Sequence, residues 1–277
     1  MGETPHHLDD DVPRASCAVM TQLPPILGSV QAAANLDPAE IERFSRLASE
    51  WWDPNGKFRP LHKIGPARIQ FVRDEICRRL GRPCEGMRPL SGLTLLDIGC
   101  GGGLVCEPMA RMGAAVTGVD PAQANIAAAA RHAEAQGLSI DYRAVEAEQL
   151  VAQGAAFDAV LCLEVVEHVP DPLAFLKTCA TLVRPGGVLI VSTINRTLKS
   201  YALAIVGAEY ILRWLPVGTH RWDRFVTPAE LQAHVAAAGL RVWETRGLVF
   251  NPLRDTWSLS ADTDVNYLLS AAKPEAA

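Results

Sequence analysis

The sequence predicts an α/β fold: a doubly wound, mostly parallel sheet of seven strands, with an antiparallel strand near the C-terminus and a helical cap at the N-terminus. From residue 93 onward, short apolar runs alternate with helical patterns, which is typical of a parallel sheet covered on both faces. A glycine cluster at 99–103 follows the first apolar run, and Asp120 ends the second. Because open α/β sheets bind ligands where their strands end, these residues indicate a nucleotide site.

The elements follow in order from Asp37, an N-cap residue before Pro38 at a helix start. Apolar residues continue at helical spacing to Ala48, the stretch 51–66 is expected to be a loop, and 66–80 a second helix. Strands are expected at 93–98, 115–119, 140–144, 157–163, 188–193, 241–249 and 265–271, and helices between them at 104–111, 122–136, 172–182 and 227–239. The last helix has a capping box at its start and a glycine at its end, and a long irregular connection joins the last two strands.

Composition and charge narrow the class of protein. The 277 residues are 49% hydrophobic with a formal net charge of −5, which fits a medium-sized globular domain and argues against a nucleic-acid partner. The seven cysteines form no C-x-x-C pair, which favours reduced thiols in a cytosolic protein. No stretch of about 18 apolar residues is free of charge, so no membrane-spanning helix is expected.

The chain is expected to divide into three parts. The acidic segment 1–35 lacks the pattern of a signal peptide and is expected to be a disordered tail. Residues 36–91 are expected to form a helical cap or lid, and 92–277 the α/β domain. An insertion at 196–225 within that domain is expected to be a lid or to face a membrane.

The glycine cluster decides between two nucleotide cofactors. The dinucleotide fingerprint G-x-G-x-x-G needs a small sixth residue, but the two frames that begin at Gly99 and Gly101 place Leu104 and Cys106 there. The observed spacing is G-x-G-x-G, the signature of methyltransferases that use S-adenosylmethionine (SAM). Asp120, 21 residues after Gly99, can accept hydrogen bonds from both ribose hydroxyls in either class. The sequence therefore predicts a SAM site that includes Gly99, Gly101 and Asp120.

A second cluster, E-x-x-E-H, follows the strand at 157–163. Leu163 at the end of this strand is expected to pack against adenosine, and Glu164, Glu167 and His168 come directly after it. Carboxylates and an imidazole at this spacing could hold Mg²⁺ or another divalent ion beside a catechol. In the alternative interpretation the acids are solvated and His168 only caps a helix.

Longer motifs extend the pattern over residues 44–269. The sequence resembles the ubiquinone-biosynthesis O-methyltransferase family, which comprises 3-demethylubiquinol 3-O-methyltransferases and polyprenyl-6-hydroxyphenol methylases. The stretches that carry this resemblance are WWDPNGKFRPLHKIGPARIQFV, LDIGCGGG, EVVEHVPDP, STINRT, VGAEYILRWLPVGTH and DVNYLL. The glycine loop is generic, whereas the W-W-D, G-A-E-Y-I-L-R and D-V-N-Y stretches are specific. The long acidic N-terminus departs from the family, and methionine also occurs in the family where this chain has Leu163.

The resemblance implies a Rossmann-like class I SAM-dependent methyltransferase domain at 92–277. It implies that Arg68 reaches the carboxylate of SAM, as suits a guanidinium group. The implied substrates are polyprenylated catechols and demethylubiquinols, with both O-methylation steps of ubiquinone synthesis performed by this chain. It also implies partners in a ubiquinone-biosynthesis complex. Alternatives are a small-molecule methyltransferase outside quinone synthesis and a SAM-binding regulator without turnover.

Two chemical routes to the reacting phenolate stay open at this point. His168 could act as general base, because its reference pKa of about 6.5 suits proton removal near neutrality. A metal ion held by Glu164, Glu167 and His168 could instead coordinate both catechol oxygens and lower their proton affinity.

The segment 199–215 has a broad apolar face with basic residues at its flanks. It predicts a cytoplasmic protein that is peripherally associated with the inner face of the membrane. The apolar face, which includes Leu212 and Trp214, is expected to enter the bilayer, and the basic flanks are expected to attract anionic lipids. The alternative is a lid helix that buries this face against its own sheet.

Overall fold

The computed structural model describes Met1, residues 37–203 and residues 221–275. The described residues from Asp37 onward belong to one compact unit. The predicted tail at 1–35, apart from Met1, and the part of the insertion that contains Leu212 and Trp214 lie outside the described residues. The proposed boundaries of cap and domain therefore stay predictions.

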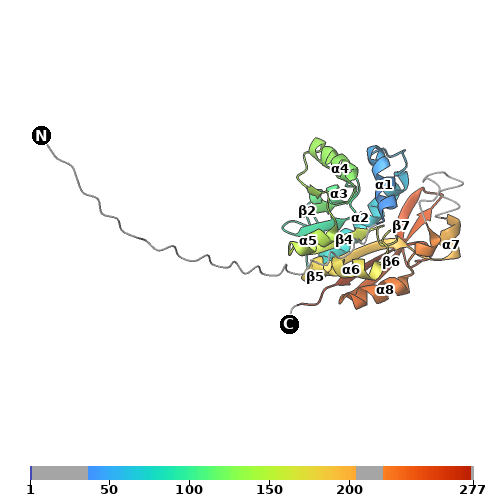
Figure 1. The fold of residues 1–277 in the computed structure, drawn as a ribbon. Coiled ribbons are helices and arrows are strands. Elements are labelled where there is room, and N and C mark those ends of the chain that lie inside the picture. The colour runs from blue at the N-terminus through green and yellow to red at the C-terminus, as the bar shows by residue number, and fades with distance from the viewer. Residues whose placement is uncertain (2–36, 204–220, 276–277) are drawn as a thin grey trace, which may run out of the picture. The chain divides into compact units, whose positions relative to one another are not determined.

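One sheet of eight strands organises the described residues (Figure 1), in the order β3-β2-β1-β4-β5-β8-β6-β7. The strands are β1 Thr94–Ile98, β2 Ala115–Val119, β3 Asp141–Arg143, β4 Phe157–Leu163, β5 Val183–Ile194, β6 Arg241–Asn251, β7 Thr256–Ser260 and β8 Asn266–Ala272. Strands β1 to β5 pair in parallel, whereas β8 runs antiparallel to its neighbours β5 and β6, and β6 pairs antiparallel with β7. This topology confirms the predicted doubly wound, mostly parallel sheet with an antiparallel strand near the C-terminus.

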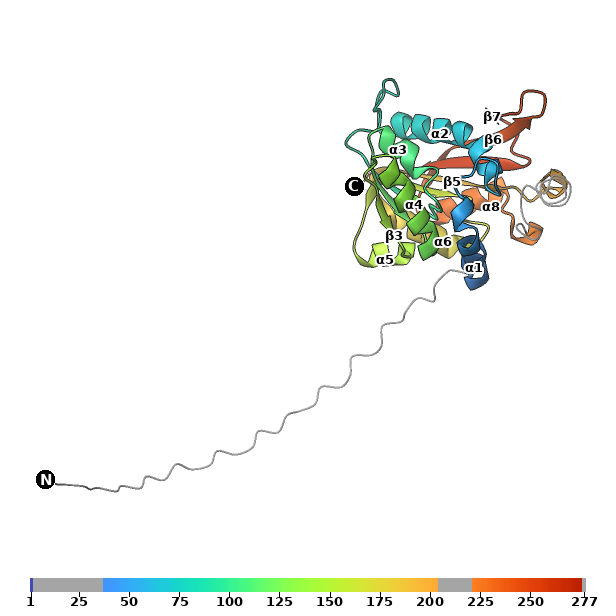
Figure 2. The same cartoon turned by 90° about the horizontal axis from the view of Figure 1, so that it is seen from above.

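Helices cover both faces of the sheet (Figure 2). α2 Arg59–Arg79, α3 Cys106–Arg111 and α4 Gln123–Ala135 lie on one face, and α5 Ala147–Ala152, α6 Pro172–Leu182 and α8 Pro228–Ala237 on the other. Side chains alternate between the two layers: Leu95 and Leu161 pack under α2, whereas Leu96 and Val160 pack under α6. The short helices α1 Pro38–Arg46 and η1 Ala48–Glu50 lie at the ends of the parallel strands, next to α4. Two further short elements, α7 Leu198–Ser200 and η3 Trp222–Arg224, flank the undescribed part of the insertion.

Several elements differ from the sequence prediction, among them β5, which begins at Val183 rather than at residue 188. Helix α2 begins at Arg59 rather than at Pro66, so that Pro66 lies inside it. Packing outweighs the proline, since Phe58 and Ile64 are buried on either side of the start of the helix. The predicted irregular connection contains β7, which extends the sheet because its Trp257 packs against the same core as α2. The short helix α5 was not predicted.

Candidate active site

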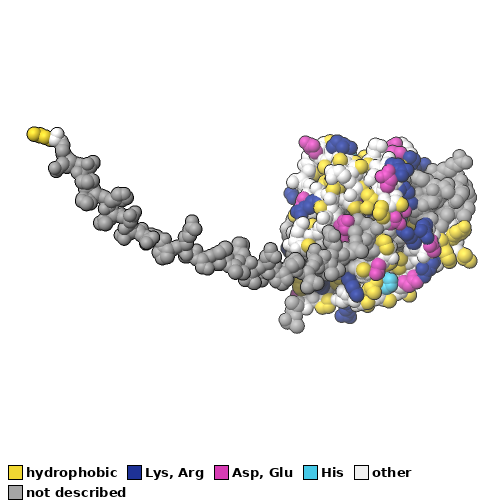
Figure 3. Space-filling view, viewed as in Figure 1, with side chains coloured by type: hydrophobic (Ala, Val, Ile, Leu, Met, Phe, Trp, Pro, Cys, Tyr) yellow, Lys and Arg dark blue, Asp and Glu magenta, His cyan; other side chains and the backbone are white. Residues whose placement is uncertain are grey.

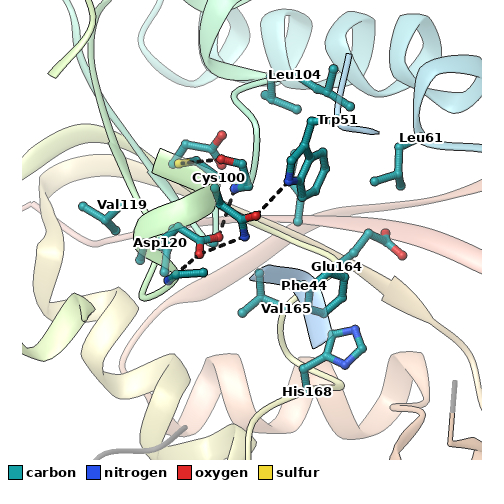
Figure 4. A pocket seen from close by; sticks show the side chains of 18 of the residues that line it. Phe44, Trp51, Leu61, Cys100, Leu104, Val119, Asp120, Glu164, Val165 and His168 are labelled. Atoms are coloured by element: carbon teal, nitrogen blue, oxygen red, sulfur yellow. Dashed lines mark hydrogen bonds between the residues drawn. The ribbon is translucent and has the colours of Figure 1, made fainter. Parts of the chain in front are cut away.

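A cavity of about 470 Å³ opens at the carboxyl ends of β1, β2 and β4 (Figure 4). Helix α1, the residues Trp51 and Trp52 that follow η1, and the start of α2 line its other side. All the predicted site residues line it: Arg68, Gly99, Gly101, Asp120, Leu163, Glu164, Glu167 and His168. The fold thus brings residues up to 100 positions apart into one site, although their individual roles stay predictions.

The glycine loop needs its glycines for two physical reasons. Gly99 and Gly101 have φ values of 71° and 53°, in the left-handed region that disfavours other residues. A Cβ atom on Gly101 would also lie 2.4 Å from the ring of Trp51, and one on Gly99 would lie 2.5 Å from Cγ2 of Val165. The loop therefore turns sharply and is tightly packed against the cap.

Asp120 directly follows β2 beside this loop, and backbone and side-chain donors hold its carboxylate. The Gly101 N–H donates to Oδ2 over 3.1 Å, and the Ala122 N–H donates to Oδ1 over 2.8 Å. The Asn125 amide also donates to Oδ1, over 3.2 Å. Burial raises the pKa of Asp120, and these hydrogen bonds oppose the shift. The site thus presents an oriented carboxylate to the cavity.

Asp97, a second buried acid near the loop, lies within β1. The Cys106 thiol donates to its Oδ2 over 3.2 Å. Burial raises the pKa of Asp97 to about 7. Asp97 thus lies below the loop, and its carboxyl group changes charge near neutral pH.

Arg68 reaches the cavity from α2 and is buried. Its Nη2 lies 2.8 Å from Oε1 of Glu164, which also accepts a hydrogen bond from the Ser192 hydroxyl over 2.6 Å. Its Nε is buried without a hydrogen-bond partner. A buried donor without an acceptor destabilises the protein, and a carboxylate bound in the cavity would supply that acceptor. Arg68 therefore fits a carboxylate ligand in the cavity.

The E-x-x-E-H residues have separate partners. Glu164 pairs with Arg68, and its φ of 56° is unusual for a residue other than glycine. Glu167 is buried and accepts a hydrogen bond from the Thr193 hydroxyl over 2.8 Å; burial raises its pKa. Among the described residues, no three His, Cys, Asp or Glu side chains are arranged to hold a metal ion. In this conformation the residues present do not fit the predicted divalent-ion site.

His168 faces the cavity and pairs with the cap. Its Nδ1 lies 2.9 Å from Oε2 of Glu40 on α1, and its ring meets Phe44 edge-on with centroids 5.6 Å apart. Burial alone would lower its pKa, but the carboxylates of Glu40 and Glu167 outweigh this and raise it. Figure 4 shows His168, Phe44 and Glu164 on one side of the site and Asp120 on the other.

Sequence reasoning did not assign roles to Glu40 or Asn125. Glu40 lies 128 positions before His168, and no local signal connects them. Asn125 could have been noticed as a polar residue within an alanine-rich helix, five positions after Asp120. Trp51, from the W-W-D stretch of the family resemblance, also lines the cavity.

Comparisons with known proteins agree with this geometry. A family model described as a methyltransferase domain matches residues 67–245. A ubiquinone biosynthesis O-methyltransferase from Azorhizobium caulinodans is 58% identical over 238 residues, which cover 86% of this chain and 94% of the relative. A protein of the same name from Rhizobium etli is 55% identical over 243 residues, which cover 88% and 98% of the two chains.

Solved structures share the fold at low sequence identity. A magnesium protoporphyrin IX methyltransferase from Synechocystis, with bound S-adenosylhomocysteine (SAH), matches with a TM-score of 0.56 and 21% identity, over 84% of this chain and 94% of that one. The N-methyltransferase NodS from Bradyrhizobium japonicum, also with SAH, matches with a TM-score of 0.56 and 17% identity over 85% and 99%. These structures show the shared fold, and the sequence matches show that the chain belongs to the ubiquinone biosynthesis O-methyltransferase family.

Proposed function

We propose that this protein is a SAM-dependent O-methyltransferase that acts on phenolic hydroxyls of polyprenylated catechols and demethylubiquinols, at both O-methylation steps of ubiquinone synthesis. One observation carries the proposal: a single cavity holds the glycine loop and Asp120 on one side and His168 with its acidic neighbours on the other. The first side suits a nucleoside-bearing donor, and the second suits removal of a phenolic proton. The names of the relatives supply the pathway.

The cofactor contacts follow from the groups that line the cavity. SAM supplies an electrophilic methyl group on a sulfonium sulfur. The unpartnered Nε of Arg68 is placed to donate a hydrogen bond to the carboxylate end of this cofactor. Asp120 accepts from ribose, Leu163 forms an apolar wall for adenosine, and Gly99 and Gly101 let the backbone approach closely.

His168 is the group that we assign to proton removal. An Nδ1–H that donates to Glu40 leaves Nε2 with a free lone pair, the tautomer that a general base requires. The walls of the cavity must then hold donor and acceptor about 3 Å apart and in line. Glu40 belongs to the cap, so the base is complete only when α1 lies over the site.

The role of Glu164, Glu167 and His168 as ligands of Mg²⁺ or another divalent ion stays a prediction. It requires that Glu164 leave Arg68 and that His168 leave Glu40. Assay of extensively chelated enzyme decides it. Full activity after chelation excludes the metal route, whereas activity that is lost and then restored by Mg²⁺ supports it.

The reaction itself is tested with labelled SAM and a short-prenyl catechol, or with the corresponding demethylubiquinol, followed by mass analysis of the product. A labelled methyl ether from both substrates is the expected result. Binding of SAM without turnover of any phenol would favour the regulator. Turnover only of phenols that lack a prenyl chain would favour a methyltransferase outside quinone synthesis.

We also infer peripheral binding to the inner face of the membrane, where a prenylated substrate resides. Within the described residues no helix is both long and apolar enough to cross a bilayer. Hydrophobic side chains are exposed on both sides of 204–220, at Leu198, Tyr201, Leu203 and Trp222. We call these four residues the flanking apolar patch. Such side chains can enter the interfacial region of a bilayer.

Electrostatic attraction contributes less than the sequence suggested. The basic residues around the insertion have acidic partners: Arg196 pairs with Glu230, Lys199 with Asp262 and Asp264, Arg221 with Asp223, and Arg224 with Asp37. Acidic and basic side chains are also interspersed on the face shown in Figure 3. We therefore expect the insertion of apolar side chains to contribute most of the membrane-binding free energy. Partners in a biosynthetic complex stay a prediction.

A further inference from the structure

We propose that Trp51 and Asn125 are positioning residues that orient the Asp120 carboxylate toward the cofactor ribose, and that they thereby make cofactor affinity depend on the N-terminal cap. The inference rests on the ribose contact proposed above for Asp120. Trp51 lies in the cap after η1, Asn125 lies on α4, and Asp120 directly follows β2. Three separate elements thus meet in one chain of hydrogen bonds, drawn in Figure 4.

The direction of these hydrogen bonds is fixed by the indole N–H at one end, which can only donate, and by the carboxylate at the other, which accepts. The Trp51 indole Nε1 can only donate, and it lies 2.9 Å from Oδ1 of Asn125. The Asn125 amide nitrogen must then point the other way, and it donates to Oδ1 of Asp120 over 3.2 Å. Asn125 is 1% exposed, so water cannot readily take the place of either partner, and loss of one hydrogen bond leaves a buried polar group unpaired. The Trp51 N–H therefore selects the amide orientation that Asp120 needs.

The consequence for Asp120 follows from its acceptor capacity. A carboxylate offers about four lone-pair positions, two on each oxygen. Oδ1 accepts from the Ala122 N–H and from Asn125, while Oδ2 accepts, among the residues that the structure describes, only from the Gly101 N–H. One position on Oδ2 stays available to a ligand. We infer that Oδ2 of Asp120 accepts a hydrogen bond from one ribose hydroxyl. Asn125 holds the carboxylate in the rotamer that allows this hydrogen bond.

The Trp51 ring has a second contact that can be separated from its N–H. It stacks on Phe58 with centroids 3.7 Å apart and planes 5° apart, and it covers the glycine loop, where a Cβ on Gly102 would lie 2.3 Å from it. A phenylalanine at position 51 keeps most of this apolar contact and removes only the donor. Trp52 offers a matched control, because its Nε1 donates to the Gly102 carbonyl over 2.9 Å rather than to Asn125 or Asp120.

The test compares the binding of SAH with that of its 2′-deoxy and 3′-deoxy ribose analogues by titration calorimetry on the full chain. Wild-type protein is expected to lose affinity for the one analogue that lacks the hydroxyl accepted by Asp120. Trp51→Phe and Asn125→Leu are expected to weaken SAH binding by roughly three- to tenfold, the usual effect of one lost hydrogen bond. Neither substitution should weaken binding of that analogue further, because the contact on which they act is already absent.

The control and the outcomes separate this inference from the proposed function. Trp52→Phe should affect SAH and both analogues by the same factor. If Trp51→Phe also weakens all three ligands equally, the tryptophan is only structural and the inference is wrong. Should wild-type protein bind the three ligands equally, Asp120 does not contact ribose, and both the assigned cofactor contact and the inference fail. If Asn125→Leu does not fold, Trp51→Phe alone decides.

Discussion

The Asp97 carboxyl, at the scale of single residues, makes the stability of the protein depend on pH. Its pKa in the folded chain is about 7 because it is buried, whereas an unfolded chain restores a value near 3.8. Between these values the folded state binds a proton that the unfolded state does not. The free energy of unfolding therefore falls as pH rises through this window. Burial raises the pKa values of Asp120 and Glu167 as well, so they act in the same direction.

We expect Asp97→Asn to stabilise the protein at about pH 8 relative to wild type, and to do so much less at about pH 5, where the wild-type carboxyl is already protonated. The difference should be on the order of a few kcal/mol at the higher pH. Urea unfolding at the two pH values measures it. A stability difference that does not change with pH would contradict the assigned burial of the charge.

A second residue-scale prediction separates backbone strain from steric overlap. Gly101 and Gly137 both have positive φ, 53° and 67°, but a Cβ on Gly101 would meet the Trp51 ring at 2.4 Å, whereas one on Gly137 would meet nothing within 4 Å. Gly137→Ala should cost about 1 kcal/mol of stability and leave SAM affinity unchanged. Gly101→Ala should cost more and should also abolish measurable SAM binding. Chemical unfolding and calorimetry test both, and equal effects of the two substitutions would show that the cap does not press on the loop.

Elements of the parallel half were predictable because their signals are local. Each of β1, β2 and β4 is an apolar run that ends at a turn, and the glycine loop and Asp120 stand where such runs end. The start of α2 was missed because Pro66 reads locally as a break, while the burial of Phe58 and Ile64 depends on distant partners. Strand β7 was missed for the same reason, since Thr256–Ser260 becomes a strand by pairing with β6.

The flanking apolar patch yields a prediction at the scale of elements. Wild-type protein should float with vesicles that contain anionic phospholipid, and Leu203→Glu should reduce this binding at least tenfold because a charge opposes apolar insertion. The same loss is expected for Leu212→Glu and Trp214→Glu. Met87→Glu is the matched control, because Met87 is 91% exposed in the connection between α2 and β1.

The membrane prediction also has a salt dependence. Because the basic residues around the insertion are already paired, raising the salt concentration should weaken vesicle binding only in part. Wild-type protein that fails to float even at low salt would rule out the membrane contact and leave the insertion as a lid. An equal loss on Met87→Glu would show that the effect is not specific to this surface.

The whole molecule assembles the site from parts that no short stretch of sequence connects. Arg68 comes from α2, His168 from the loop after β4, and its partner Glu40 from α1. The residue types and their strand ends could be predicted, but the pairing of Arg68 with Glu164 and of Glu40 with His168 depends on how the cap packs over the sheet. Ligand binding to this site should therefore stabilise cap and sheet together.

Thermal unfolding provides the prediction for the whole molecule. A ligand that binds only the folded state, at about 100 times its dissociation constant, adds about 2.7 kcal/mol to the free energy of unfolding. For a chain of this size each kcal/mol raises the melting temperature by roughly 2–4 °C, so SAH should raise it by about 5–10 °C. NAD at the same concentration should have no effect, because Leu104 and Cys106 stand where a dinucleotide loop needs a small residue. A rise with NAD, or none with SAH at saturation, would contradict the cofactor assignment.

A single transition that shifts as a whole would show that cap and sheet unfold together, whereas a separate, unshifted early transition would show that the cap does not contribute to the cofactor site.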